Sequence, residues 1–226
     1  MAHETAARPE SAAFYGEDYF GRRRFAKLLP YLPSDGPIAD FGCNIGVFLN
    51  FLRANGRHGV GIDFDEESVR TCRANGLEAS HADIFEFTSR AENRGRYAGI
   101  MMADFVEHFD PVVLQRLLRD GLGLLGPRGV LVILTPNSRS VSMCAGGFYE
   151  TTIEHHNLYS LHGLRTFLEK QGLRFVAGGV DPDSRLEVLT AHPLRLLRNV
   201  ALWVLGRILC GKDAFYTQTY LVMERP

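Results

Sequence analysis

The sequence lacks several features that define large classes of protein. It has no uninterrupted apolar run near the length of about 20 residues that spans a bilayer. Residues 1–14 are polar and contain no apolar core of signal-peptide length. No CxxC pair or zinc-ligand spacing occurs. We therefore expect a cytoplasmic protein without a zinc centre and with reduced thiols; its four cysteines are Cys43, Cys72, Cys144 and Cys210.

An excess of positive charge is also missing. The formal net charge is −1, whereas broad nucleic-acid binding relies on a basic field over phosphates. The chain has 226 residues, of which 46% are hydrophobic and 23% are charged. These values are typical of a globular chain with a substantial core. They predict one domain over 1–226, with a helical lead-in within 1–36, and no nucleic acid as a partner.

Short apolar segments alternate with amphipathic ones along most of the chain. The strand candidates mostly lack polar alternation, which is typical of buried parallel strands. Alternation at this spacing predicts an α/β, Rossmann-like, doubly wound sheet with helices on both faces. We expect strands over 37–42, 58–63, 77–83, 97–103, 129–135, 173–180 and 213–224, and helices over 14–32, 45–54, 66–74, 112–125, 160–171 and 192–211.

A sharp turn after the first strand points to a ligand. Gly42 and Gly46 leave the backbone open beside the start of a helix, whose N–H groups can hold an anion. Asp63 ends the second strand, where a carboxylate can accept hydrogen bonds from both ribose hydroxyls. The dinucleotide pattern GxGxxG and the phosphate-loop pattern are both absent. A nucleoside ligand without a pyrophosphate is therefore favoured, and S-adenosylmethionine fits this description.

Five motifs in order resemble class I S-adenosylmethionine-dependent methyltransferases, in particular the branch that methylates quinone precursors, sugars and natural products. The resemblance covers residues 14–180 and implies a mostly parallel seven-stranded sheet with an antiparallel last strand. Asn44 stands where many family members have glycine, and asparagine tolerates positive φ, so we expect cofactor binding to be retained. The motifs are IADFGCNIGVFLNFL, GVGIDFDEESV, ASHADIFEF, YAGIMMADFVEHF and GVLVILTPNS.

The resemblance also implies a set of cofactor-binding residues. They would hold the methionine part, the ribose, the adenine and the sulfonium of S-adenosylmethionine, with S-adenosylhomocysteine as the product. In that order the residues are Asp40, Gly42, Cys43 and Gly46 for the methionine part, Asp63 for the ribose, Phe64, Asp83 and Ile84 for the adenine, and Ala103, Asp104 and His108 for the sulfonium end, with Tyr15 and Tyr19 of the lead-in as a cap.

Methyl transfer from a sulfonium needs no metal, and catalysis is mostly alignment. A hydroxyl acceptor would gain from a general base, and histidine has a suitable pKa. His155 and His156 follow the fifth strand, on the side expected for the acceptor, and His156 is favoured. A metal site formed by Glu154, these two histidines and His162 is disfavoured, because adjacent residues rarely converge on one ion. The predicted activity is an O-methyltransferase acting on a small molecule.

Several alternatives stay open. The segment 138–159 has the composition of a substrate lid or of a plain surface loop. The apolar helix over 192–211 could pack on the domain itself, form a dimer contact or rest on a membrane surface. The chain is expected to be a monomer or a homodimer. Rival functions are a non-catalytic nucleoside-binding module and a nicotinamide-dependent oxidoreductase, while RNA methylation is disfavoured by the net charge.

Overall fold

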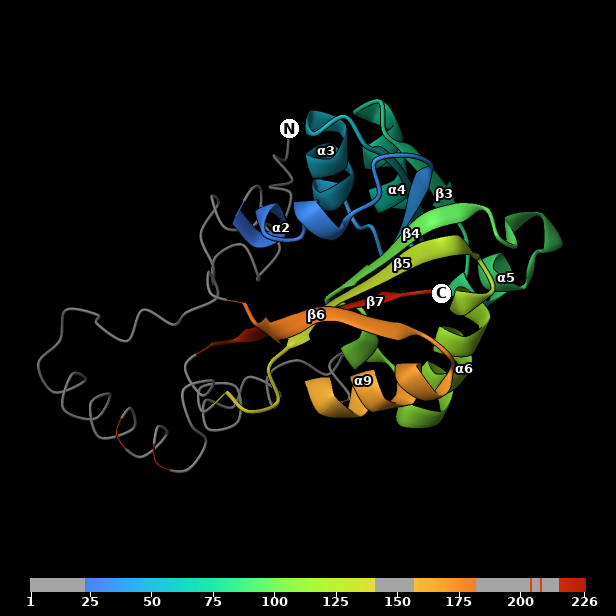
Figure 1. Ribbon diagram of the computed structural model, residues 1–226. Helices are drawn as coiled ribbons and strands as arrows, with labels where there is room; N and C mark the ends of the chain where they lie inside the picture. The colour runs from blue at the N-terminus through green and yellow to red at the C-terminus, as the bar shows by residue number, and fades with distance from the viewer. Residues whose placement is uncertain (1–22, 141–156, 182–203, 205–207, 209–215) are drawn as a thin grey trace, which may run out of the picture.

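The computed structural model describes residues 23–140, 157–181, 204, 208 and 216–226 (Figure 1). In this part of the chain seven strands form one sheet in the order β3-β2-β1-β4-β5-β7-β6. β7 runs antiparallel to β5 and β6, and the other pairings are parallel. The predicted sheet is confirmed. Its strands are β1 Pro37–Phe41, β2 His58–Asp63, β3 Glu78–His81, β4 Tyr97–Ala103, β5 Leu125–Pro136, β6 Arg174–Val180 and β7 Gln218–Glu224.

Helices cover both faces of the sheet, as expected (Figure 1). Side chains of α2 and α3 pack with one face, and those of α5, α6 and α9 pack with the other. No helix among the described residues is long and apolar enough to cross a bilayer. The α-helices are α2 Arg24–Ala26, α3 Val47–Ala54, α4 Glu66–Ala74, α5 Ile84–Ser89, α6 Pro111–Leu122 and α9 Leu161–Lys170, and the 3₁₀ helices are η2 Leu29–Tyr31, η3 Ala91–Asn93 and η4 Val106–His108.

Several boundaries differ from the sequence-based expectation, and at two of them a capping residue decides where a helix begins. The strand expected over 77–83 is shorter, since Asp83 accepts hydrogen bonds from the N–H groups of Phe85 and Glu86 and so starts α5. The helix expected over 112–125 starts at Pro111, after its cap Asp110, and ends at Leu122. β5 therefore begins at Leu125, earlier than the expected residue 129.

The strand order reverses beside β1, and this reversal positions the site. β1 pairs with β2 on one side and with β4 on the other, all in parallel. Helix α3 connects β1 to β2 on one face, whereas α5 precedes β4 on the opposite face. In such sheets the turns at the carboxyl ends of the central strands diverge and leave a crevice between them. The turns after β1, β2 and β4 are therefore brought together.

Candidate cofactor site

A cavity of about 590 Å³ lies at the carboxyl ends of the central strands. Its residues come from the turns after β1, β2, β3 and β4, so segments that are far apart in the sequence share one hollow. Apolar and acidic side chains both contribute to it. The lining residues are Gly42, Asn44, Ile62, Asp63, Phe64, Asp65, Ser68, Ala82, Asp83, Ile84, Phe85, Asp104, Phe105, His108 and Phe109.

The turn after β1 is held by its own hydrogen bonds. The N–H groups of Gly42 and Cys43 donate to the carbonyl of Ile62, and that of Gly46 donates to the carbonyl of Cys43. The N–H of Asn44 donates to Asp63 Oδ2 at 2.8 Å, and that of Ile45 donates to Asn44 Oδ1 at 2.6 Å. All five N–H groups of the turn are thus used internally. A ligand carboxylate would instead meet the first turn of α3, where helix geometry leaves N–H groups without intrahelical acceptors.

Each glycine of the turn has a packing reason as well as a conformational one. Gly42 has φ +71°, and a Cβ there would lie 2.6 Å from Phe105 Cδ2. Gly46 has φ +85°, and its Cβ would lie 2.6 Å from Leu77 Cδ1. Asn44 also adopts positive φ, at 46°, as its tolerance for that region predicts. Gly46 is therefore required by the packing of α4 and β3 on the turn and does not line the cavity.

The Asp63 carboxylate is fixed at the tip of β2. Its Oδ1 accepts the N–H of Asp65 at 2.9 Å, while its Oδ2 accepts the N–H of Asn44 at 2.8 Å. The residue is 8% exposed and lines the cavity. Each carboxylate oxygen retains capacity for a further hydrogen bond. The side chain therefore joins the turns after β1 and β2 and still presents acceptors to a ligand.

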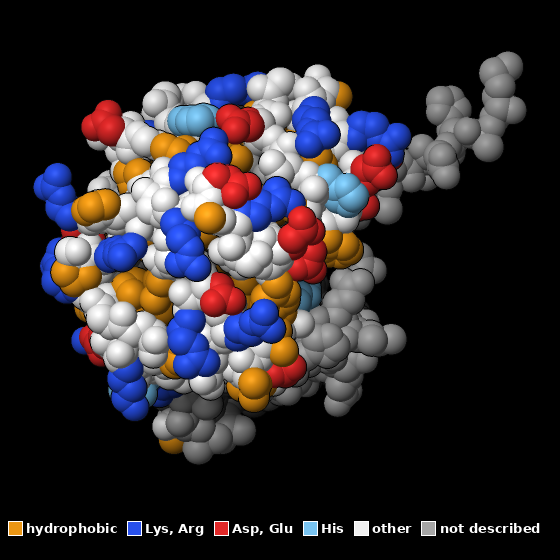
Figure 2. Space-filling view, turned by 90° about the vertical axis from the view of Figure 1, so that its right-hand side faces the viewer, with side chains coloured by type: hydrophobic (Ala, Val, Ile, Leu, Met, Phe, Trp, Pro, Cys, Tyr) orange, Lys and Arg blue, Asp and Glu red, His pale blue; other side chains and the backbone are white. Residues whose placement is uncertain are grey.

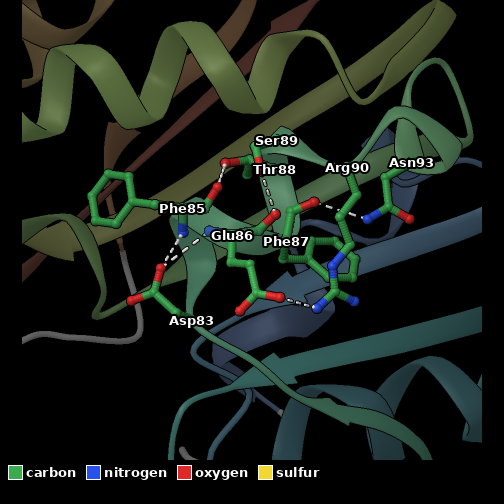
Figure 3. A network of polar contacts seen from close by, with 8 residues as sticks. All are labelled: Asp83, Phe85, Glu86, Phe87, Thr88, Ser89, Arg90 and Asn93. Atoms are coloured by element: carbon green, nitrogen blue, oxygen red, sulfur yellow. Dashed lines mark hydrogen bonds and ion pairs between the residues drawn. The ribbon is translucent and has the colours of Figure 1, made fainter.

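Asp83 lies at the start of α5 and caps this helix (Figure 3). Its Oδ1 accepts the N–H groups of Phe85 at 2.8 Å and Glu86 at 3.1 Å. The cap leaves Oδ2 outside this network, and the residue lines the cavity together with Ile84. Phe64 also lines it with a ring that is 81% exposed. An apolar surface with one carboxylate oxygen at its edge suits a planar heterocycle that carries an amino group.

The turn after β4 brings a charged pair to the other part of the cavity. Asp104, at φ 48°, forms an ion pair with Arg24 of α2 and accepts a hydrogen bond from Gln218 Nε2 at 3.0 Å. His108 Nε2 lies 3.1 Å from the carbonyl oxygen of Asp104. Arg24 is almost fully buried. The lead-in segment and β7 therefore both fix this acidic side chain.

Two further acids lie buried beside these residues. Burial, and then the nearby charge of Asp63, raise the pKa of Asp40 to about 8, while Arg24 opposes the rise. Burial, and then Asp104, raise the pKa of Glu107 to about 8. Glu107 is 0% exposed, and its Oε2 accepts the hydroxyl of Thr135 at 3.1 Å. Both carboxyl groups are therefore largely protonated near pH 7.

Stability should therefore fall as pH rises. The ordinary pKa of Glu107 is 4.5 and its folded pKa is about 8, so between these values the folded protein binds more protons than the unfolded chain. Rising pH through this window consequently lowers the free energy of unfolding. We expect the melting temperature of Glu107→Gln to fall less than that of the wild type between about pH 5 and about pH 8. Differential scanning calorimetry across that range checks this, and parallel curves would contradict it.

The structure brings most of the predicted cofactor residues together. Of those within the described residues, the ones that line the cavity are Gly42, Asp63, Phe64, Asp83, Ile84, Asp104 and His108. Asp40, Cys43, Gly46 and Ala103 lie next to it in the strands and turns but outside its lining. Tyr15, Tyr19, His155, His156, most of the 138–159 segment and the helix over 192–211 lie outside the described residues.

Sequence reasoning missed an aromatic part of the lining. Phe105 and Phe109 have ring centroids 5.0 Å apart, and Phe85 and Phe109 have centroids 6.1 Å apart, each pair edge to face. The i, i+4 spacing of Phe105 and Phe109 in DFVEHF was a usable signal, but their shared direction depends on η4. Asn44, Asp65 and Ser68 were also missed as cavity residues.

Comparison with known proteins agrees with the geometry. A family described as a methyltransferase domain matches residues 14–177. The chain belongs to this family. This confirms the methyltransferase predicted from the five motifs, and S-adenosylmethionine is its co-substrate. No curated protein matches this chain in sequence.

Solved structures confirm the class I methyltransferase fold. A SAM-dependent methyltransferase from Archaeoglobus fulgidus is 21% identical with a TM-score of 0.75, over 96% of this chain and 98% of that one. One from Mesorhizobium loti is 16% identical with a TM-score of 0.59, over 91% and 99% of the respective chains. A structure titled as a sarcosine dimethylglycine methyltransferase from Galdieria sulphuraria is 16% identical with a TM-score of 0.60, over 89% and 82%.

Proposed function

We propose that this methyltransferase moves the methyl group of S-adenosylmethionine to a hydroxyl oxygen of a small molecule. The observation that carries the proposal is the single cavity of about 590 Å³ that contains both the anchored carboxylate of Asp63 and the acidic turn at Asp104. A nucleoside and a cationic group can occupy those two parts at once. The negative charge of the Asp104 carboxylate favours a cation at that end of the cavity.

The proposed pose of the cofactor follows the lining. Asp63 accepts hydrogen bonds from the ribose hydroxyls, using the capacity that its two backbone contacts leave. Phe64 and Ile84 cover the adenine, and the free oxygen of Asp83 accepts its amino group. The methionine part runs past Gly42 toward Asp104, with its carboxylate near the first turn of α3 and its ammonium facing backbone oxygens near Asp40.

The acceptor is proposed to carry a polar group because several polar side chains lie near Asp104. Gln218 and Arg24 both contact Asp104, and the buried Glu107 and Thr135 lie beside them. In the transfer an acceptor oxygen forms a bond to the methyl carbon as the carbon–sulfur bond breaks, and the hydroxyl proton passes to a base. The similar structure from Galdieria sulphuraria is described as a sarcosine dimethylglycine methyltransferase. Oxygen as the nucleophile therefore rests on the predicted histidine base and not on the fold.

His156 is proposed as that base. The residue that follows it, Asn157, donates its N–H to the carbonyl of Glu107 at 3.1 Å and its side-chain amide to the carbonyl of Phe109 at 2.9 Å. This ties the chain next to the histidine pair to η4, whose His108 lines the cavity.

We expect His156→Ala to lower kcat by about 100-fold, because a positioned base contributes about that factor or more. Affinity for S-adenosylhomocysteine should stay unchanged. Steady-state kinetics and calorimetry measure the two quantities, and His58→Ala, on the exposed start of β2, serves as the matched control. Unchanged turnover in His156→Ala would remove this residue as the base.

Binding and transfer together test the proposed function. Calorimetry with S-adenosylhomocysteine and with NADH establishes which nucleoside the cavity takes. Formation of S-adenosylhomocysteine is then followed with panels of hydroxyl and amine acceptors. Binding with methylation of hydroxyl compounds supports the proposal. Preference for amines overturns the oxygen assignment, binding without any transfer indicates a nucleoside-binding module, and preference for NADH indicates the rival oxidoreductase.

A further inference from the structure

Four carboxyl groups lie in or beside the cavity, one at the end assigned to the ribose, one at the end assigned to the sulfonium and two buried next to these. Asp63 and Asp104 line the cavity, while Asp40 and Glu107 lie buried beside them. Asp40 is on the central strand β1, near the end of the strand that leads into the turn before α3. Glu107 is in η4, directly before the cavity residue His108. The acids therefore come from β1, β2 and the segment after β4, and Arg24 lies close enough for its charge to act on three of them.

Little positive charge faces them in the described part of the chain. Arg24 forms an ion pair with Asp104, and its charge also acts on Asp40 and Glu107. The groups that face Asp40 are Asp63, Arg24 and the thiols of Cys43 and Cys72. If all four acids were ionised, they would exceed this one guanidinium by three charges. Such an excess is costly inside a protein, so some of these acids stay protonated until a cation arrives.

Glu107 has a hydrogen-bonding arrangement that suits either protonation state. Its Oε2 accepts the hydroxyl of Thr135, and its Oε1 has no hydrogen-bond partner among the described residues. The charges facing it are those of Asp104 and Arg24. A buried carboxyl group with one unused oxygen can keep a proton there or lose it without breaking its existing hydrogen bond. The carboxyl group of Asp40 also favours its protonated form, since burial and then Asp63 raise its pKa to about 8.

The co-substrate and the product differ by one charge at this place. S-adenosylmethionine carries a positively charged sulfur, whereas S-adenosylhomocysteine has lost the methyl group and has a neutral thioether; the rest of the two molecules is the same. We propose that Asp40 and Glu107 make the site selective for the charge of the sulfur, by losing protons when the sulfonium binds and regaining them when the neutral product forms. This inference rests on the proposed function, because it requires the sulfonium near Asp104.

The consequence is a cofactor preference that depends on pH. Because binding of the sulfonium releases protons, higher pH favours S-adenosylmethionine over S-adenosylhomocysteine. If one additional proton is released, the ratio of their affinities rises by up to about tenfold for each pH unit between about 6 and 8. Product inhibition should weaken over the same range. The preference arises from groups that need not touch the sulfur and act through the field of their charges.

Isothermal titration calorimetry tests the proposal without any methyl acceptor. Each ligand is titrated at pH 7 in phosphate and in Tris, whose different ionisation enthalpies reveal the number of protons released. We expect S-adenosylmethionine to release about half a proton or more beyond S-adenosylhomocysteine. Sinefungin, which carries an amine in place of the sulfonium, should behave like the co-substrate. In the isosteric variants Asp40→Asn and Glu107→Gln the difference should shrink, and in the double variant it should approach zero. Glu67→Gln, on the exposed face of α4, should keep it.

The outcomes separate this inference from the proposed function. If both ligands bind to the wild type with equal proton release, the inference is overturned. The binding itself would still support the cofactor site. A difference that persists in the double variant would assign the protons to other groups and would overturn the roles of Asp40 and Glu107. Absence of binding by either ligand would instead overturn the proposed function. Circular dichroism of each variant establishes that it is folded before titration.

Discussion

Replacing Asp63 with alanine is expected to weaken binding of S-adenosylhomocysteine by about 100-fold or more. Hydrogen bonds to a charged group contribute about 1.5–3 kcal/mol each. Loss of two of them to the ribose corresponds to about 3 kcal/mol, which is about 100-fold in the dissociation constant. The variant also removes the acceptor for the N–H groups of Asn44 and Asp65, so the turn after β1 loses one of its links to β2. Calorimetry measures the affinity directly.

Two further variants keep that result interpretable. Asp63→Asn retains an amide oxygen for one of the two backbone donors, and we expect its affinity to lie between those of the wild type and Asp63→Ala. Glu66→Ala removes a nearby acid from the first turn of α4 and should bind normally. If Asp63→Ala is folded and binds with undiminished affinity, the ribose assignment is wrong.

Gly42→Ala is expected to cost about 3 kcal/mol of stability. The residue has φ +71°, and the added Cβ would lie 2.6 Å from Phe105 Cδ2. A left-handed backbone costs a residue with a Cβ about 1 kcal/mol or more, and overpacking adds about 1–3 kcal/mol. Chemical denaturation of the two proteins under the same conditions provides the comparison.

Gly56 is the matched control, because it isolates the backbone contribution. Its φ of +66° is similar, and nothing lies within 4 Å of an added Cβ. Gly56→Ala should therefore cost only about 1 kcal/mol. Placing Gly42→Ala in a Phe105→Leu background should recover part of the steric cost and none of the backbone cost, as a double-mutant cycle can measure. Equal losses at Gly42 and Gly56 would show that contact with Phe105 does not matter.

The sequence was sufficient where short-range patterns carry the information. The strands β2 and β4 lie where the apolar runs predicted them, and α4 spans its predicted range, directly after its cap Asp65. The spacing from the glycine turn to Asp63 also placed both in one cavity, because adjacent parallel strands end at the same edge of the sheet. The end of β3 at His81 could not be predicted as well, since a single cap, Asp83, decides where α5 begins.

The sequence by itself determined the order of strands and helices along the chain and the acid at the tip of β2. These features depend on the pattern of neighbouring residues and on the residues that begin and end each element. Only the tertiary structure decided that Phe105 packs against Gly42, that Arg24 reaches Asp104 and that Glu107 is fully buried. Those contacts join residues that lie tens of positions apart or in different turns. Burial and electrostatic fields depend on distances in space, so the protonation of Asp40 and Glu107 follows from the packing of the whole fold.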